Sequence, residues 1–244
     1  MMRYTIRYVS LLAGMLTVFS SCEHKDLCFD HEAHAPKSDV HVKAVYEKEW
    51  EHTCEGGPDW EQYPAWESRF GMEYHELCPD APDGLRVQVY NEDGTNNILN
   101  VAPEGDIVRM RPGEHSLLLY NNDTEYIVFD DMNSFASAKA TTRTRTRASY
   151  AGNPYMENTV ENTVNAPDML YGNYMENYTA ERKIEADELP VTMHPLVFTY
   201  LVRYEFSHGL EYVALARGAL AGMAGAVWLN SGRTSEEAAT ILYD

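Results

Sequence analysis

Short runs of alternating apolar and polar residues, separated by turn residues, are the feature that most constrains the fold of this chain. In the first run, 40–47, Val40, Val42, Ala44 and Tyr46 share one face, and a period of two gives a strand one inner face. Leu85, Val87 and Val89 repeat this alternation, and further short strands are predicted at 107–110, 116–120 and 126–129, with turn sequences between them. No segment of useful length has the helical period here, so 40–136 is predicted to be an antiparallel β-sandwich.

Residues 51–80 interrupt this pattern and are rich in Trp, Pro, Glu and Gly. We expect a long loop or insertion between two strands. Aromatic side chains in and beside it would form a binding site for a glycan or a host protein if they were exposed. The candidates are Trp50, Trp60, Tyr63 and Trp66.

The composition changes again over 137–189, which is predicted to be an irregular linker rich first in Arg and Thr and then in Tyr and Asn. Arg143, Arg145 and Arg147 alternate with threonine, and no apolar residue alternates with them. An exposed segment of this kind is open to trypsin-like proteases. Two copies of the tetrapeptide Tyr-Met-Glu-Asn, at 155–158 and 174–177, are interpreted as parts of a polar surface segment.

A second β region is predicted over 190–244. Within 196–207 every second residue from Phe198 to Phe206 is aromatic or aliphatic, so these side chains share one face. This pattern favours a core strand, because aromatic side chains suit sheet packing. The apolar run 219–229 has eleven residues, too few to span a membrane, and its glycines favour a strand. The last residues, 241–244, read as the start of another strand. We therefore expect an incomplete domain, either because the chain is truncated or because a strand comes from elsewhere.

The first 21 residues have the pattern of a secretory signal: Arg3 and Arg7, an apolar run over 9–19, and then small residues. Cys22 follows directly, as in the lipobox of bacterial lipoproteins, where the thiol is acylated and becomes the new N-terminus. Phe19 stands where that pattern usually has leucine. The alternative is an ordinary secreted protein in which Cys22 is incidental. Residues 22–39 are polar and predict a tether.

The chain is acidic, with a formal net charge of -19 at pH 7. Nucleic acid is therefore not an expected partner, because binding to it depends on Lys and Arg that neutralise phosphates. An anionic membrane would also repel the chain, so membrane attachment is expected to depend on the lipid at Cys22.

Sequence motifs of common catalytic sites are missing. The chain has no GxSxG, no phosphate-binding loop ending in GK[ST] and no HExxH. Its carboxylates are too numerous for any pair to be singled out as an acid and a base. The sequence therefore predicts a protein that is not an enzyme and holds no cofactor.

Cysteine and histidine residues gather in the first third of the chain. In an oxidising compartment a disulfide between Cys54 and Cys78 is the preferred prediction, with Cys28 free or paired with either. The alternative is a zinc or copper site, although the spacing matches no closed motif. Its ligands would be Cys28, Asp30, His31 and His34, with His52 or His75 as a further ligand.

Three stretches resemble a known protein family. They are Cys22 to His31 (CEHKDLCFDH), Gly84 to Gly94 (GLRVQVYNEDG) and Arg111 to Phe129 (RPGEHSLLLYNNDTEYIVF), which are similar to uncharacterised Bacteroides lipoproteins. Those proteins are similar in layout to fimbrillin and fimbrial-anchor (FimB/Mfa-type) lipoproteins, and PDMLYG (167–172) and ALAGMAG (219–225) echo motifs of that group. Two features depart from the fimbrillin pattern: the arginine cluster lies between the predicted domains, and the C-terminal sheet is short.

The resemblance implies an all-β fold, with two transthyretin-like or immunoglobulin-like β-sandwich domains joined by the linker and the second domain incomplete. It also implies a lipoprotein of the outer membrane, exposed at the cell surface. Such a protein would act as an adhesin or as a fimbrial subunit or anchor, and its partners would be other subunits or host ligands. A surface binding module for a glycan or host protein is the first alternative, and a metal-binding lipoprotein the second.

Overall fold

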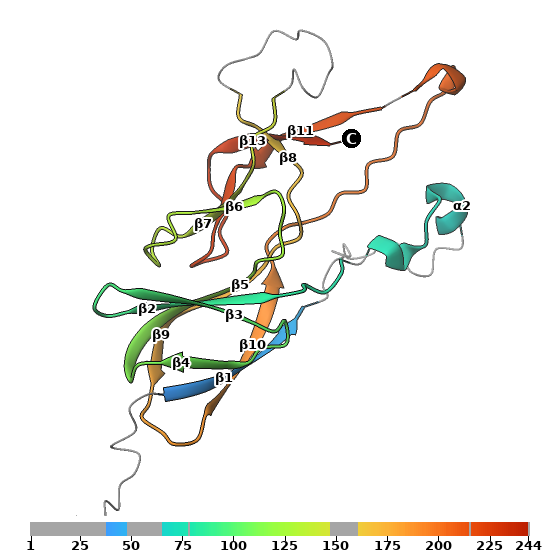
Figure 1. The fold of residues 1–244 in the computed structure, drawn as a ribbon. Helices are drawn as coiled ribbons and strands as arrows, with labels where there is room; N and C mark the ends of the chain where they lie inside the picture. Colours follow the sequence, from blue (N-terminus) through green and yellow to red (C-terminus); the bar gives the residue numbers. More distant parts are fainter. Residues whose placement is uncertain (1–37, 48–64, 78, 147–160, 215, 244) are drawn as a thin grey trace, which may run out of the picture. The chain divides into compact units, whose positions relative to one another are not determined.

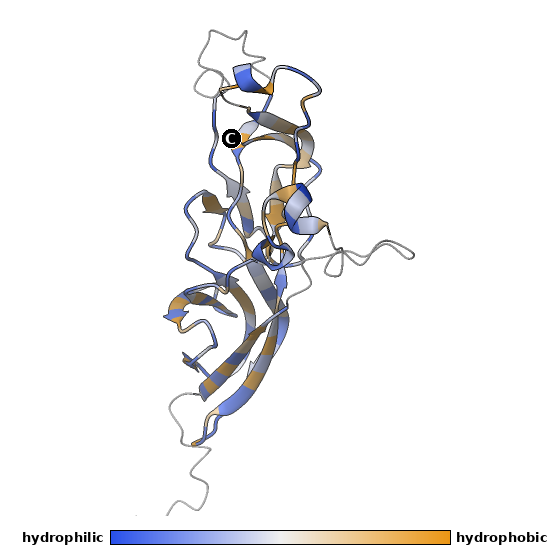
Figure 2. Ribbon diagram, turned by 90° about the vertical axis from the view of Figure 1, so that its right-hand side faces the viewer, coloured by the Kyte–Doolittle hydropathy of each residue, from blue (hydrophilic) through white to orange (hydrophobic). Residues whose placement is uncertain are grey.

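The computed structural model of the chain describes residues 38–47, 65–77, 79–146, 161–214 and 216–243 (Figure 1). These residues form thirteen strands and only three short helical turns: α2 (Trp66–Phe70), η3 (Tyr74–Leu77) and η4 (Leu210–Tyr212). The prediction of an all-β chain is therefore confirmed in its general form. In Figure 2 hydrophilic and hydrophobic bands alternate along several strands, as expected for strands with one buried face.

One sheet has seven strands in the order β3-β2-β5-β9-β10-β1-β4. All neighbours in it are antiparallel except β1 and β10, which are parallel over seven residue pairs. Their bounds are β1 Ser38–Tyr46, β2 Leu85–Asn91, β3 Asn96–Val101, β4 Ile107–Met110, β5 Gly113–Asn121, β9 Tyr171–Ala180 and β10 Asp187–Pro195.

Two further sheets have three strands each, in the orders β12-β7-β6 and β11-β13-β8. An isolated bridge between Thr144 and Val164 joins the end of β7 to β8, and β8 pairs in parallel with β13. Their bounds are β6 Ile127–Asp130, β7 Lys139–Thr142, β8 Thr163–Asn165, β11 Gly218–Ala224, β12 Ala226–Trp228 and β13 Ala238–Tyr243.

The seven-stranded sheet encloses the first hydrophobic core. β9 and β10 pair at only two positions, His194 with Gly172 and Pro195 with Tyr171, so the sheet opens between them. Side chains from the part with β3, β2, β5 and β9 and from the part with β10, β1 and β4 meet in one cluster. They include Val40 and Val42 of β1, Val87 and Val89 of β2, Val108 and Met110 of β4, Leu117 and Leu119 of β5, and Val191 and Met193 of β10.

The opposite face of β2 and β5 builds the second core. Leu118 and Tyr120 of β5 and Tyr90 of β2 pack with residues of β6, β7 and β12, including Ile127 and Ala140. The Tyr90 hydroxyl donates a hydrogen bond to the Met132 carbonyl at 2.9 Å, and burial raises the pKa of Tyr90 above its ordinary value. β5 is thus covered on both faces and belongs to both cores.

The prediction of an irregular linker over 137–189 is wrong for much of its length, because β7, β8, β9 and the start of β10 lie there. β9 pairs with β5 along most of its length. Between Met175 and Tyr178, β9 has one residue more than β5 opposite it, which is a β-bulge. The bulge shifts the buried face of β9 by one residue, so the alternation that marks a strand in the sequence is interrupted.

The core strand predicted at 196–207 is also absent. These residues belong to no strand, and although Leu196 and Val197 pack against the second core, the large apolar side chains from Phe198 to Phe206 are exposed. The predicted strand at 219–229 is formed as β11 and β12, separated at Gly225. Alternation selects one face of an extended segment, but a strand also needs a continuous backbone partner, and the described residues supply none for 199–206.

Gly105 offers a sharp test of the first core. It has a φ of +103°, and a Cβ at this position would lie 2.0 Å from the backbone oxygen of Val42 in β1. We expect Gly105→Ala to lower the free energy of unfolding by about 3 kcal/mol or more, since a backbone clash adds to the strain of a positive φ. Urea denaturation of the purified protein measures this.

Gly94→Ala is the matched control, because Gly94 has a φ of +79° but no atom within 4 Å of its Cβ position. Its cost should be about 1 kcal/mol, from backbone strain alone. Equal losses for the two variants would contradict the close approach of Gly105 to β1.

Candidate functional site

An extended segment without strand partners borders the candidate site. This segment, residues 197–206, is called the strap. The Leu196 amide just before it donates to the Leu170 carbonyl at 2.7 Å, and near its other end the hydroxyls of Tyr204 and Tyr243 lie 3.0 Å apart. Between these points, residues 199–206 make no backbone hydrogen bond to any residue that the structure describes. The strap is therefore held near both of its ends, and its residues 199–206 have no backbone partner in the described part of the chain.

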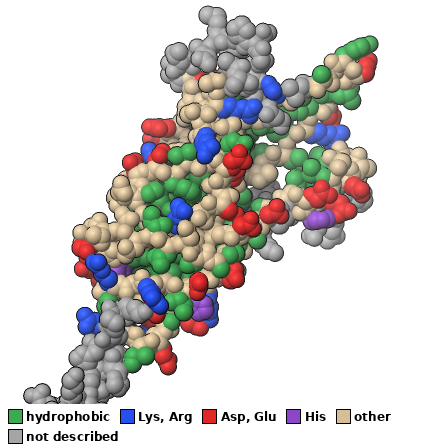
Figure 3. Space-filling view, viewed as in Figure 1, with side chains coloured by type: hydrophobic (Ala, Val, Ile, Leu, Met, Phe, Trp, Pro, Cys, Tyr) green, Lys and Arg blue, Asp and Glu red, His purple; other side chains and the backbone are tan. Residues whose placement is uncertain are grey.

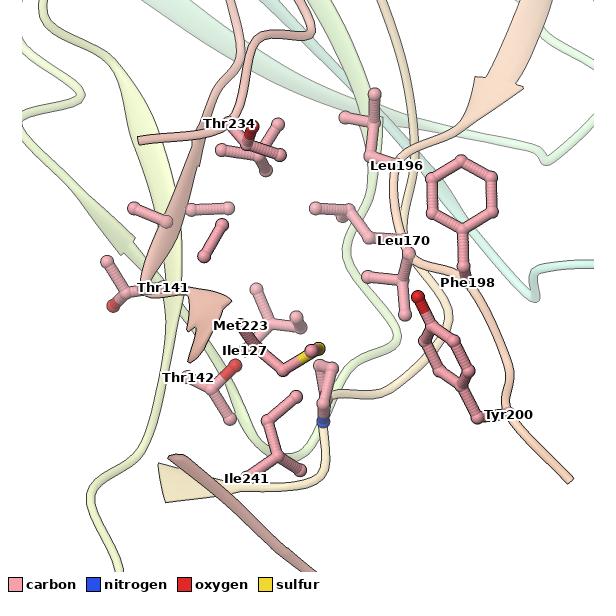
Figure 4. Close-up of a pocket in the computed structure, with 17 residues that line it drawn as sticks. Ile127, Thr141, Thr142, Leu170, Leu196, Phe198, Tyr200, Met223, Thr234 and Ile241 are labelled. Carbon is pink, nitrogen blue, oxygen red and sulfur yellow. The ribbon is translucent and has the colours of Figure 1, made fainter. Parts of the chain in front are cut away.

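Between the strap and the two small sheets lie two adjoining cavities, of about 200 Å³ and 520 Å³. Five residues line both cavities, so the two form one groove: Pro167, Val197, Phe198, Tyr200 and Ile241. In Figure 4 Phe198 and Tyr200 lie on one side of the smaller cavity and Thr141, Thr142 and Met223 on the other. The larger cavity continues along the strap to Tyr204 and Tyr243.

The groove is apolar. No Lys, Arg, His, Asp or Glu stands among the described residues that line either cavity. Its walls are aromatic and aliphatic, with threonine and tyrosine hydroxyls as the polar side-chain groups. Such a surface favours an uncharged apolar occupant, because a charged group would lose its hydration without gaining a partner.

Close packing at the mouth of the groove depends on Gly218, the first residue of β11. A Cβ there would lie 2.2 Å from the Tyr243 hydroxyl and 2.3 Å from the Tyr204 hydroxyl. The missing side chain therefore gives the two hydroxyls the space in which they meet. The pair of Tyr204 and Tyr243, called the clasp, fastens the strap to the end of β13.

Asp168 shapes the floor of the groove. Its Oδ2 atom accepts backbone hydrogen bonds from Glu125, Tyr126 and Ile127, at 2.9, 2.5 and 3.2 Å. Its neighbour Pro167 lines both cavities. The carboxylate thus ties the chain under the groove to the start of β6.

The helical turn α2 contacts the strap from the predicted insertion. The Arg203 guanidinium lies 5.5 Å from the centre of the Phe70 ring, within the range of a cation–π contact. Trp66 is only 8% exposed and packs against Phe70 and Tyr74, so little of its ring is free for a ligand. The rest of the proposed aromatic set, Trp50, Trp60 and Tyr63, lies outside the described residues, so that site stays a prediction.

Most of the other site residues predicted from the sequence also lie outside the described residues: Cys22, Cys28, Asp30, His31, His34, Cys54, Cys78 and Arg147. Among the residues that are described, no group of three or more His, Cys, Asp or Glu could hold a metal ion. No helix in the described part is long and apolar enough to cross a membrane.

Arg143 and Arg145 are described, and their backbones are not free. The Arg143 carbonyl accepts from the Asn165 amide at 3.0 Å, and the Arg145 amide donates to the Thr163 carbonyl at 2.9 Å. A protease would have to displace these hydrogen bonds at the two arginines to cleave there. Cleavage at the arginine cluster stays a prediction.

The groove could not be predicted from the sequence, and the segment that borders it was wrongly predicted to be a core strand. The signal was a long alternating apolar run in a domain with too few strands to cover it. The walls come from residues far apart in the sequence, such as Ala140, Pro167 and Ile241, and only the fold brings them together.

We expect Asp168→Ala to lower the free energy of unfolding by about 2–4 kcal/mol, because three backbone amides lose a charged acceptor. Thermal unfolding followed by circular dichroism measures the change. Glu125→Gln removes an exposed carboxylate from the same turn and should change stability by less than about 0.5 kcal/mol. A similar loss in both variants would contradict the specific role of Asp168.

Comparisons with known proteins agree with this fold. The chain is 27% identical over 178 residues to "Putative fimbrium anchoring subunit Fim4B" of Bacteroides ovatus, covering 71% of this chain and 50% of that protein. The chain thus spans about half the length of this curated relative. The resemblance to Bacteroides fimbrial-anchor proteins expected from the sequence is confirmed.

Solved structures show the same similarity at the level of the fold. The crystal structure of a "putative adhesin" from Bacteroides ovatus has a TM-score of 0.57 and 21% identity, covering 92% of this chain and 66% of the other. A second "putative adhesin" from that species has a TM-score of 0.46 and 10% identity, covering 84% of this chain and 62% of the other. Residues 64–244 match the family described as "Domain of unknown function (DUF5119)", and the chain belongs to this family.

Proposed function

We propose that this protein is a lipoprotein of the outer membrane with a structural or adhesive role at the cell surface. It acts as a fimbrial subunit or anchor and joins its partners by strand addition. A lipid on Cys22 holds it to the membrane, and residues 22–37, before β1 begins at Ser38, form the tether. The role is not enzymatic.

The groove beside the strap is the observation that carries this proposal. The backbone amides and carbonyls of residues 199–206 have no strand partner among the residues that the structure describes, and β11 stands at the edge of its sheet. Unpaired backbone of this kind accepts an added strand, whose main chain supplies hydrogen bonds and whose alternate side chains fill pockets. Eight extended residues span about 26 Å, enough for a partner strand of ordinary length.

The names of similar proteins support the same role. The curated relative is named as a fimbrium anchoring subunit, and the solved structure with the higher TM-score is named as an adhesin. Neither name describes an enzyme. An apolar groove without charged lining fits the attachment of a protein segment better than acid–base chemistry.

Lipid anchoring is tested at Cys22. We expect the unchanged protein to partition into the detergent phase of an extract, and Cys22→Ala to move to the aqueous phase because the acylated thiol is lost. Cys28→Ala is the matched control, since Cys28 lies six residues further along the same tether. The assignment would be contradicted if the Cys28→Ala variant moved to the aqueous phase, or if the Cys22→Ala variant stayed in the detergent phase.

Strand addition is tested in the groove by Val202→Asp. Val202 lines the larger cavity and is 39% exposed, so the variant can fold while placing a carboxylate among apolar walls. In the organism that makes the protein, the unboiled extract should show heat-labile multimers on a denaturing gel. Val202→Asp should reduce them at least tenfold, because the added strand would desolvate the charge.

Leu201→Asp is the control, because Leu201 is its neighbour on the strap, is 43% exposed and lines neither cavity. It should leave the multimers at their normal level. Protease added outside intact cells should degrade the protein if it is displayed at the surface. Equal amounts of heat-labile multimers in the Val202→Asp and Leu201→Asp variants would contradict strand addition at the groove.

A further inference from the structure

An exposed apolar loop begins at the end of the strap. This loop, residues 205–213, shares its first two residues with the strap and includes η4; it is called the finger. Its large apolar side chains face solvent: Tyr212 is 85% exposed and Leu210 62%, and Phe206 and Val213 are also exposed. In Figure 3 hydrophobic side chains run along the arm that ends in η4. Clustered exposed apolar side chains of this kind mark an interaction surface.

The finger does not occupy the groove of its own chain. None of the residues 205–213 lines either cavity. Both ends of the finger are fixed at one end of the groove, since Tyr204 is held by the clasp and Ala216 lines the same cavity as Tyr204. One chain therefore carries an open apolar groove and, next to it, an apolar segment that lies outside it.

We propose that the occupant of the groove is the finger of a second copy of this chain, so that copies associate head to tail. This inference rests on the proposed function, because it names the partner that adds a segment to the groove. No charged residue stands among the described residues that line the groove, so nothing there opposes an apolar finger. Tyr212 and Leu210 lose their water-exposed surface on insertion, which supplies the driving force.

The geometry of such a contact has a consequence for assembly. The groove and the finger are different surfaces. A dimer formed by one contact therefore still has one open groove at one end and one free finger at the other. A contact of this type is heterologous and extends into a chain of subunits unless its rotation closes a ring. Because each copy has a net charge of -19, repulsion opposes the contact, and added salt strengthens it by screening.

The test is sedimentation velocity over a range of concentrations, with every variant in a Cys22→Ala background so that no lipid is attached. Val202→Asp places a charge in the apolar groove, and Tyr212→Asp places a charge on the apolar finger, so each variant should lose one of the two binding surfaces. Ile184→Asp is the matched control, since Ile184 is 65% exposed in the loop between β9 and β10. Circular dichroism melting confirms that each variant is folded.

We expect the Cys22→Ala protein and its Ile184→Asp variant to form multimers that grow with concentration, and each of the other two variants to stay monomeric. An equimolar mixture of Val202→Asp and Tyr212→Asp should form a dimer that grows no further. In that dimer the intact finger of the first variant fills the intact groove of the second. The remaining groove and the remaining finger are both blocked.

Two outcomes would overturn the inference and keep the proposed function. One is self-association of Tyr212→Asp at the normal level while Val202→Asp stays monomeric, because the occupant would then be another segment. The other is a Cys22→Ala protein that stays monomeric at every concentration while Val202→Asp still abolishes multimers in cells. Normal self-association of Val202→Asp, with normal multimers in cells, would overturn both the inference and the proposed function.

Discussion

The structure depends on the burial of β5 from both sides. Leu117 and Leu119 face the core inside the seven-stranded sheet, and Leu118 and Tyr120 face the core under β6, β7 and β12. A strand with two buried faces has no side on which polar residues can be placed freely. The two cores are therefore not independent, since a change in the backbone position of β5 alters the packing of both. The smaller sheets, and with them the groove, inherit their position from this strand.

Much of the first core could be predicted from the sequence, because β1 and β2 contain alternating apolar residues and β4 and β5 are short apolar segments bounded by clear turns. β9 could not, because its bulge interrupts the alternation and its ladder with β5 depends on residues 60 positions away, as the bond from Ser116 to the Glu176 carbonyl shows. β7 and the residue before it bury only the small side chains of Ala140 and Ala138, which carry little hydrophobic signal.

For the strap the prediction from sequence was wrong in the opposite direction, since a strand was predicted and none is formed in the described residues. Its sequence is more strand-like than that of β9, yet it forms no strand in the described residues, because pairing is a property of two segments and alternation a property of one. The candidate site arises from this mismatch between an apolar face and the backbone available to cover it. Asp168, Gly218 and the clasp then give the groove its floor and its mouth, and none of the three carries a pattern that sequence reasoning would select.

The parallel pairing of β1 and β10 has a mechanical meaning. β1 starts at Ser38, just after the tether, and β10 ends at Pro195, just before the strap. Tension applied between the tether and the strap pulls the first end of β1 and the last end of β10 in opposite directions along their axes. The seven residue pairs between Val40 and Tyr46 are then loaded together in shear, and do not open one after another as in peeling. A protein held at these two points resists force with its whole parallel ladder at once.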